Sequence, residues 1–133
     1  MKEKKQYTVL SFDLDGTLID DSRFGGVFWY EEVPRLYAQQ YHISVEDAKL
    51  IVLNSYKLVG HFDRNWYRPH FWFERFKLQE DWRKVIHDLH RDIRVFPDVK
   101  PALQELKNKH KLIIITHSTR EFVQLKIQVE SIK

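Results

Sequence analysis

The 133-residue sequence has no cysteine, only four glycines and four prolines, and no long apolar run. Without cysteine, neither disulfides nor thiolate metal sites are available, and we expect a protein of the reducing cytoplasm. No apolar run approaches the roughly 20 residues needed to cross a bilayer. The basic residues 1–5 precede an apolar run that lacks a small-residue cleavage site, so this start is not typical of a secretory signal.

Neither sign of charge dominates the sequence. Lysine and arginine number 22 and aspartate and glutamate 19, which gives a net charge of +3. That excess is too small to favour nucleic acid as a partner without a clustered basic patch. Hydrophobic residues at 43% and charged residues at 31% are typical of one globular domain or two small ones. We therefore expect neither a nucleic-acid nor a membrane partner.

The most informative segment is residues 12–18, Phe-Asp-Leu-Asp-Gly-Thr-Leu. An apolar run over residues 7–12 leads into this segment, and that run predicts a buried strand. Two acids spaced two apart at the carboxyl end of such a strand point toward the crevice where open α/β sheets bind ligands. An ordinary Asp-Gly turn would explain Asp15 and Gly16. It does not explain Asp13, a further acid at the end of a buried strand.

Residues 27–93 predict a helical module. The pair Gly25-Gly26 before it predicts a flexible connection, and Ser44 with Asp47 resembles a capping box. Eight aromatic residues between 61 and 82 predict a core for this module and a wall that faces the substrate. We expect helices over about residues 33–41, over 44–59, from Pro69 onward and over 82–89. Pro34 stands in the first turn of the first of these helices. In the last one, Trp82, Val85, Ile86 and Leu89 share one face.

The pattern after residue 95 predicts a helix, a strand and a second helix. The helix contains Val99 to Leu106, and residues 111–116 follow as the strongest strand signal. Four consecutive aliphatics in that run predict a parallel strand that is covered on both faces. Ser118 with Glu121 predicts a capping box for the last helix, whose apolar side carries Phe122, Leu125, Val129 and Ile132. Together with the first strand, this order predicts two parallel strands in a β-α-β unit.

The Asp-x-Asp-Gly-Thr-Leu segment resembles the first motif of the haloacid dehalogenase (HAD) superfamily. The resemblance implies that Asp13 is a nucleophile forming an aspartyl intermediate and that Asp15 is the general acid and base. It also implies that Mg²⁺ is held by Asp13 and the backbone carbonyl of Asp15. Thr116 at the end of the second strand resembles the second motif, which implies that it binds phosphate, with backbone amides near His117 and Ser118 as further donors.

On this resemblance the expected fold is α/β, a partial Rossmann-like core with two parallel strands and an inserted all-helical cap. Residues 1–18 are expected to form the first part of the core, residues 19–95 the cap, and residues 96–133 the second part of the core. In the superfamily a helical cap inserted after the first motif covers the active site in this way. The position of the insert supports the resemblance independently of the acidic motif.

The expected activity is Mg²⁺-dependent hydrolysis of a small phosphorylated metabolite, a phosphomonoester. The alternative within enzymes is 2-haloacid dehalogenation, whose branch of the superfamily lacks an acid at the position of Asp15. Loss of a halide needs no proton, whereas an alkoxide leaving group benefits from one. Asp15 therefore favours a phosphatase.

The third and fourth superfamily motifs, a lysine and further acids, are not recognisable in this sequence. Lys126 is a poor substitute because it is expected in mid-helix beside Leu125 on the core face. We therefore expect remaining core strands to be missing from the chain and its activity to be low. A two-stranded sheet is marginal in water, so the alternative of another class is a non-catalytic chain that binds a partner or self-associates through its open sheet edge.

Overall fold

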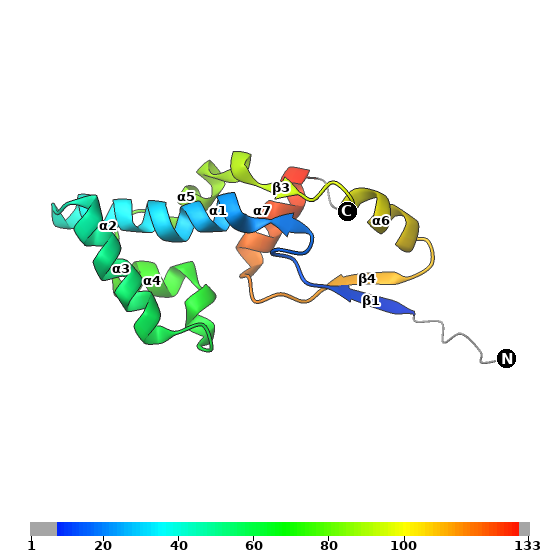
Figure 1. The fold of residues 1–133 in the computed structure, drawn as a ribbon, viewed down its shortest axis with the longest axis horizontal. Helices are drawn as coiled ribbons and strands as arrows, with labels where there is room; N and C mark the ends of the chain where they lie inside the picture. The colour runs from blue at the N-terminus through cyan, green and yellow to red at the C-terminus, as the bar shows by residue number, and fades with distance from the viewer. Residues whose placement is uncertain (1–7, 131–133) are drawn as a thin grey trace.

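Two short parallel strands form the sheet in the computed structural model, which describes residues 8–130. They are β1 (Val9–Phe12) and β4 (Lys111–Ile114), with Phe12 opposite Ile114 at their carboxyl ends. The parallel pairing confirms the β-α-β prediction. The two strands lie at one end of an elongated molecule, and the helical part extends from their carboxyl ends (Figure 1).

The burial predicted for both faces of the second strand is wrong. Along β4 the residues alternate between exposed and half-buried, and Ile113 and the following Ile115 are 37% and 65% exposed. Half-buried Leu112 and Ile114 face the helix α6 (Val99–Leu106), which has Pro101 in its first turn. No element within residues 8–130 covers the opposite face. The aliphatic sequence of β4 is typical of a strand covered on both faces, but this strand is covered on one face only.

The insert begins as a helix directly after the acidic motif. The pair Gly25-Gly26 lies inside α1, so the flexible connection predicted there is wrong. The side chain of Asp20 caps this helix by accepting from the Ser22 amide at 3.2 Å. Three helical segments then follow without a break and run along the length of the insert (Figure 1). They are α1 (Asp21–Val27), the π-helical η1 (Phe28–Glu32) and α2 (Val33–Tyr41).

The remaining helices of the insert confirm the helical module. Ser44 caps α3 by accepting from the Asp47 amide at 3.0 Å, and Pro69 stands in the first turn of α4. The side chain of Asp81 caps α5 in the same way, accepting from the Arg83 amide at 2.9 Å. The elements are α3 (Val45–Val59), η2 (Arg64–Tyr67), α4 (Pro69–Arg75), α5 (Trp82–Asp88) and η3 (His90–Asp92).

A two-residue antiparallel ribbon closes the insert and was not predicted. β2 (Ile19–Asp20) pairs with β3 (Arg94–Val95), and the Phe96 amide donates to the Leu18 carbonyl at 3.2 Å. The ribbon brings both ends of the insert together beside the acidic motif. Strands of two residues carry no detectable alternation, which is why the sequence does not reveal them.

The last helix, α7 (Arg120–Glu130), crosses beside the start of the insert (Figure 1). Phe122 is buried and packs edge-on against Phe24 and Phe28 at 5.6 and 5.5 Å between ring centres. Of the apolar side predicted for this helix, the side chain of Val129 and the whole of Ile132 lie outside the described residues. α7 therefore joins the core of the insert to the loop that follows β4.

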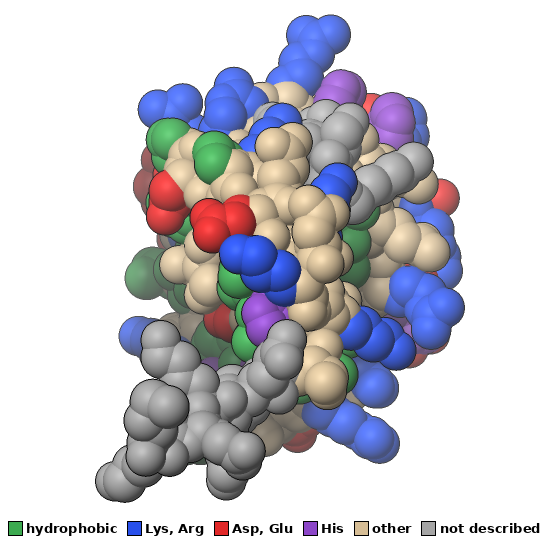
Figure 2. Space-filling model, turned by 90° about the vertical axis from the view of Figure 1, so that its right-hand side faces the viewer, with side chains coloured by type: hydrophobic (Ala, Val, Ile, Leu, Met, Phe, Trp, Pro, Cys, Tyr) green, Lys and Arg blue, Asp and Glu red, His purple; other side chains and the backbone are tan. Residues whose placement is uncertain are grey.

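The core lies mostly within the helical insert. Trp72 is fully buried, its indole N–H donates to the Trp66 carbonyl at 3.1 Å, and Phe73 and Phe76 pack beside it. These residues confirm that the aromatic stretch supplies a core, although Phe62 in the same stretch is 96% exposed. Viewed from the end that carries α6 and the sheet, the surface shows many Lys and Arg side chains (Figure 2).

Candidate functional site

The two acids of the motif follow β1 directly. Asp13 is exposed, Leu14 is fully buried and Asp15 is half-buried, so the chain alternates between solvent and core as it leaves the strand. Asp13 Oδ1 accepts from the Leu14 amide at 2.8 Å. Gly16 has φ of +78°, a left-handed conformation that glycine adopts without strain, and its amide donates to the Ile19 carbonyl at 2.8 Å. The buried Leu14 and this turn fix where the two acids lie.

The loop after β4 meets the acidic motif through Ser118. The Ser118 hydroxyl donates to Asp15 Oδ2 at 2.5 Å, and the Ser118 amide donates to Thr116 Oγ1 at 3.1 Å. Ser118 therefore does not cap the last helix, which begins two residues later at Arg120, and the predicted capping box is wrong. The hydroxyl contacts the acid of a segment 103 residues earlier in the chain.

His117, between those two hydroxyl residues, faces the insert. Its imidazole stacks on the Tyr67 ring, with 5.0 Å between ring centres and 17° between planes. The contact joins the loop after β4 to η2. Phosphate binding by Thr116, His117 and Ser118 stays a prediction, as do the roles of Asp13 and Asp15.

Lys126 lies in the site, contrary to its dismissal from the sequence. Its Nζ donates to Asp15 Oδ1 at 2.5 Å and to Asp21 Oδ1 at 2.9 Å, and only 2% of its side chain is exposed. Burial raises the pKa of Asp21 above its ordinary value, and the nearby Lys126 ammonium opposes that rise. The mid-helix position was predicted correctly, but α7 crosses so close to the motif that this position faces the acids.

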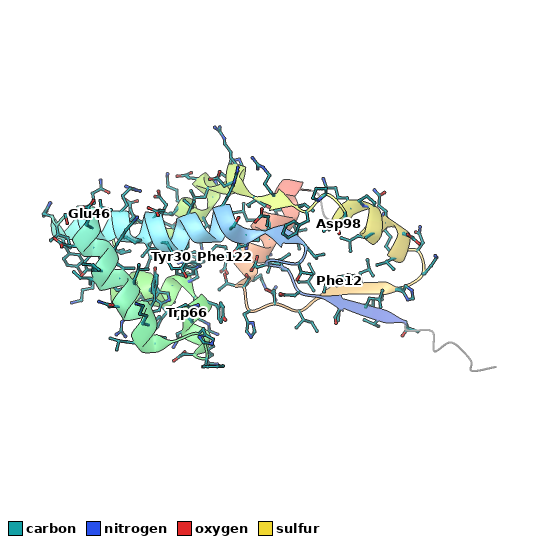
Figure 3. All side chains as sticks on the ribbon, in the orientation of Figure 1. Phe12, Tyr30, Glu46, Trp66, Asp98 and Phe122 are labelled. Carbon is teal, nitrogen blue, oxygen red and sulfur yellow. The ribbon has the colours of Figure 1, made fainter. Side chains whose placement is uncertain are left out.

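A pocket of about 620 Å³ opens beside these groups, within the range typical of ligand sites. Aromatic rings form much of its wall, and its polar lining residues are Asp15, Asp21, Ser22, Ser118 and Lys126. Three of these rings are labelled in Figure 3: Tyr30 of η1, Trp66 of η2 and Phe122 of α7. The aromatic and glycine lining consists of Gly16, Gly25, Gly26, Trp29, Tyr30, Trp66, Tyr67 and Phe122. A second hollow, of about 450 Å³, lies between α6 and the sheet and is lined by none of the motif acids.

The acidic motif offers few ligands for a metal. Among the residues that the structure describes, no group of three or more His, Cys, Asp or Glu side chains is placed to hold a metal ion. Both carboxylate oxygens of Asp15 already accept hydrogen bonds from Lys126 and Ser118. The Asp13 carboxylate and the Asp15 carbonyl are hard oxygens, and Mg²⁺ often takes only one or two carboxylates and keeps several waters. This donor set fits Mg²⁺ only with water in most positions.

Sequence reasoning missed Lys126 and Asp21 as members of the site. A signal was available for the lysine, because Lys126 lies four residues after Phe122 and so falls on the predicted apolar stripe of its helix. A charged residue on a buried stripe indicates a buried partner. Asp21 had no comparable signal, since an acid in the first turn of a helix is commonly exposed.

No helix within the described residues is long and apolar enough to cross a membrane.

An α/β core with two acids at the end of its first strand, interrupted after that strand by a helical insert, defines the class of this protein. The chain belongs to the haloacid dehalogenase-like hydrolase family, whose model matches residues 7–130.

The crystal structure of a HAD phosphatase from Thermococcus onnurineus is similar to this fold, with a TM-score of 0.79. The sequence identity is 24%, and the match covers 94% of this chain and 57% of that one. At this identity the likeness establishes the fold, and the chain spans 57% of the length of that structure. A comparison with curated proteins gave no match.

Proposed function

We propose that the site hydrolyses phosphomonoesters through a phosphorylated Asp13, with Mg²⁺ as cofactor. The observation that carries the proposal is the contact of Asp15 with Ser118 and Lys126, which joins the acidic motif to the loop after β4. This loop contains Thr116, the residue that resembles the second superfamily motif. The similarity of the fold to a HAD phosphatase supports a phosphatase over a dehalogenase.

In the proposed reaction an Asp13 carboxylate oxygen attacks phosphorus, and the bond from phosphorus to the ester oxygen breaks. Protonated Asp15 donates its proton to the departing alkoxide. Asp15 then takes a proton from a water molecule, whose oxygen attacks the aspartyl phosphate and releases inorganic phosphate and free Asp13. Thr116 is proposed to hold a phosphoryl oxygen. Bound Mg²⁺, held by Asp13 and the Asp15 carbonyl, would neutralise phosphoryl charge.

The insert, residues 19–95, is proposed to act as the cap over the core of residues 1–18 and 96–133. The stacking of Tyr67 on His117 supports this role, because it places the insert against the loop of the second motif. Trp66 and Tyr67 of the insert line the same pocket as Asp15. Such a cover excludes water from the reacting groups and contacts the leaving group of the substrate.

Binding of beryllium fluoride, a phosphoryl mimic that attaches to carboxylates, tests the role of Asp13. We expect Mg²⁺-dependent binding by the 133-residue protein in ¹⁹F NMR, and loss of the bound signal in Asp13→Asn. Asp20→Asn, a half-buried acid that caps α1, is the matched control and should retain the signal. Retention in Asp13→Asn, with deamidation excluded by mass spectrometry, would contradict the proposal.

We further propose that the 133-residue chain turns over slowly by itself. The described residues give Mg²⁺ few protein ligands, and Lys126 is the only lysine or arginine that lines the pocket. Electrostatic stabilisation of the transferred group is usually the largest catalytic contribution. Steady hydrolysis of an aryl phosphate at a typical enzymatic rate, about 10 per second, would contradict this expectation.

A second candidate function is self-association or partner binding through the sheet, favoured by exposed Val9, Ile113 and Ile115. Strand edges that present unpaired backbone groups pair readily with another chain. Light scattering over a range of concentrations tests it. A monomer at all concentrations, with native-like spectra, would count against association with a second copy.

A further inference from the structure

Lys126 is the only Lys, Arg, Asp or Glu among the described residues whose side chain is almost fully buried. Its ammonium lies 5.2 and 5.4 Å from the ring centres of Phe24 and Phe122. An ammonium in such surroundings is unfavourable unless it is paired, and an uncharged chain of similar length would fill the space without that penalty. Packing alone therefore does not account for a lysine at this position.

The pairing of Lys126 restrains Asp15 in particular. Lys126 Nζ donates to Asp15 Oδ1, and the Ser118 hydroxyl donates to Asp15 Oδ2, each at 2.5 Å. The two donors come from different places, the middle of α7 and the loop before it. A carboxylate held at both oxygens by donors from separate segments has a single orientation. Ser118 alone would leave it free to rotate about that one bond.

Asp21 holds the lysine in place through a second hydrogen bond, 2.9 Å long. It is the first residue of α1, and the helix leaves room for its carboxylate at Gly25. A Cβ atom at position 25 would lie 2.1 Å from Asp21 Oδ2. The buried Gly25 thus permits the contact that fixes Lys126 between two acids.

We propose that Lys126, anchored by Asp21, is a positioning residue that fixes the Asp15 carboxylate in its orientation for proton transfer. The inference rests on the proposed function, because Asp15 needs a fixed orientation only if it exchanges a proton with the substrate and water. Lys126 acts through Asp15 and is not assigned a contact with the phosphoryl group. Its removal frees Asp15 to turn and leaves the two carboxylates of Asp15 and Asp21 without their shared cation.

The carboxyl ¹³C resonance of Asp15, assigned by its absence in Asp15→Asn, reports this orientation without any turnover. We expect it to move in Lys126→Met, which keeps the buried stem, and to move much less in Lys126→Arg, which keeps the charge. Lys57→Met, an exposed lysine on α3, is the matched control and should leave it unchanged. An unmoved resonance in folded Lys126→Met would overturn the proposal.

Should Lys126→Met fail to fold, the unsubstituted protein and Asp21→Asn decide the question. A buried, hydrogen-bonded ammonium exchanges its hydrogens slowly and gives a ¹H–¹⁵N signal that exposed lysines do not give. We expect this signal in the unsubstituted protein and a weaker one, with a displaced Asp15 carboxyl resonance, in Asp21→Asn. Absence of the signal, or an undisturbed Asp15 in Asp21→Asn, would overturn the proposal.

Binding of beryllium fluoride with Mg²⁺ separates positioning from a direct contact with the anion. Lys126→Met should weaken binding about tenfold, the scale of one lost charge-assisted hydrogen bond. In an Asp15→Asn background the same substitution should change binding less than about twofold, because the two residues act as a unit. Equal effects in both backgrounds would overturn positioning through Asp15. If the unsubstituted protein binds no beryllium fluoride, the role of Asp13 fails, and the NMR measurements alone decide that of Lys126.

Discussion

The helical insert and the two-stranded sheet differ in how much of their apolar surface is covered. In the insert, Trp72, Phe28 and Val52 are fully buried, and aromatic rings contact one another across several helices. In the sheet, Val9 and Ile113 are 46% and 37% exposed, and a hollow of about 450 Å³ lies under α6. The part of the molecule that holds the core is thus the inserted one.

This difference separates stability from the site. The insert buries enough apolar surface to dominate the stability of the chain, since burial contributes about 25 cal/mol per Å². The sheet contributes the acids at its carboxyl end but few buried contacts. Each of the following substitutions tests whether stability divides between the two regions in this way.

Trp72→Ala should have the largest effect, a loss of about 3–5 kcal/mol in the free energy of unfolding. The substitution leaves a cavity at the centre of the insert and removes the indole hydrogen bond to the Trp66 carbonyl. Urea denaturation followed by circular dichroism measures the loss. Phe62→Ala, at a 96% exposed aromatic of the same stretch, is the control and should stay within about 0.5 kcal/mol. Similar losses at both positions would contradict the assignment of the core.

Tyr56 in the insert should make the protein less stable at alkaline pH. Burial raises the pKa of Tyr56 far above its ordinary value, and its hydroxyl donates to the Trp29 carbonyl at 3.1 Å. The unfolded chain loses the phenolic proton near pH 10 while the folded chain keeps it, so stability falls as pH rises through 10. At pH 11 this amounts to about 1.4 kcal/mol. Tyr56→Phe should show a correspondingly flatter decline between pH 9 and 11, and an unchanged slope would contradict this.

Most of the fold could be predicted from the sequence because its signals are local. The Ser44 cap, the Pro34 and Pro69 first turns and the aliphatic run of β4 all mark their elements within a few residues. Two errors came from effects that are not local. The pair Gly25-Gly26 was interpreted as a flexible connection, but it lies in a helix that needs a small residue beside Asp21 at position 25. Ile113 was expected to be buried on the assumption that both faces of its strand were covered.

The site was only partly predictable. Asp13, Asp15 and Thr116 could be predicted as candidates because they stand at strand ends, where spacing along the chain fixes their place; their roles stay predictions. Lys126 and Asp21 come together only through the crossing of α7 over α1, which no spacing in the sequence encodes. Tertiary packing therefore completes the site. The only signal of this packing in the sequence was a charged residue, Lys126, on the apolar stripe of its helix.

Ser44→Ala should cost about 1 kcal/mol, the usual value for loss of a helix cap. Its hydroxyl accepts from the Asp47 amide, which has no other acceptor in the first turn of a helix. Ser44→Asn supplies another capping oxygen and should restore most of the loss. Both are measured by thermal unfolding. If Ser44→Asn is as destabilising as Ser44→Ala, the cap does not contribute to the stability of the insert.

The smallest effect is expected directly after β4, from Ile115→Ala. Ile115 is 65% exposed, so its truncation should change the free energy of unfolding by less than about 0.5 kcal/mol. The neighbouring Ile114 is half-buried and packs against the main core, so Ile114→Ala should cost more, about 1–2 kcal/mol. Urea unfolding at two protein concentrations tests whether the exposed face stays uncovered, is covered by a second copy, or is covered within the chain itself. If Ile115→Ala is as costly as Ile114→Ala only at the higher concentration, a second copy covers the exposed face, because association then stabilises the folded chain. Equal costs at both concentrations would mean that the sheet is covered within the chain itself, and the contrast with the insert would fail.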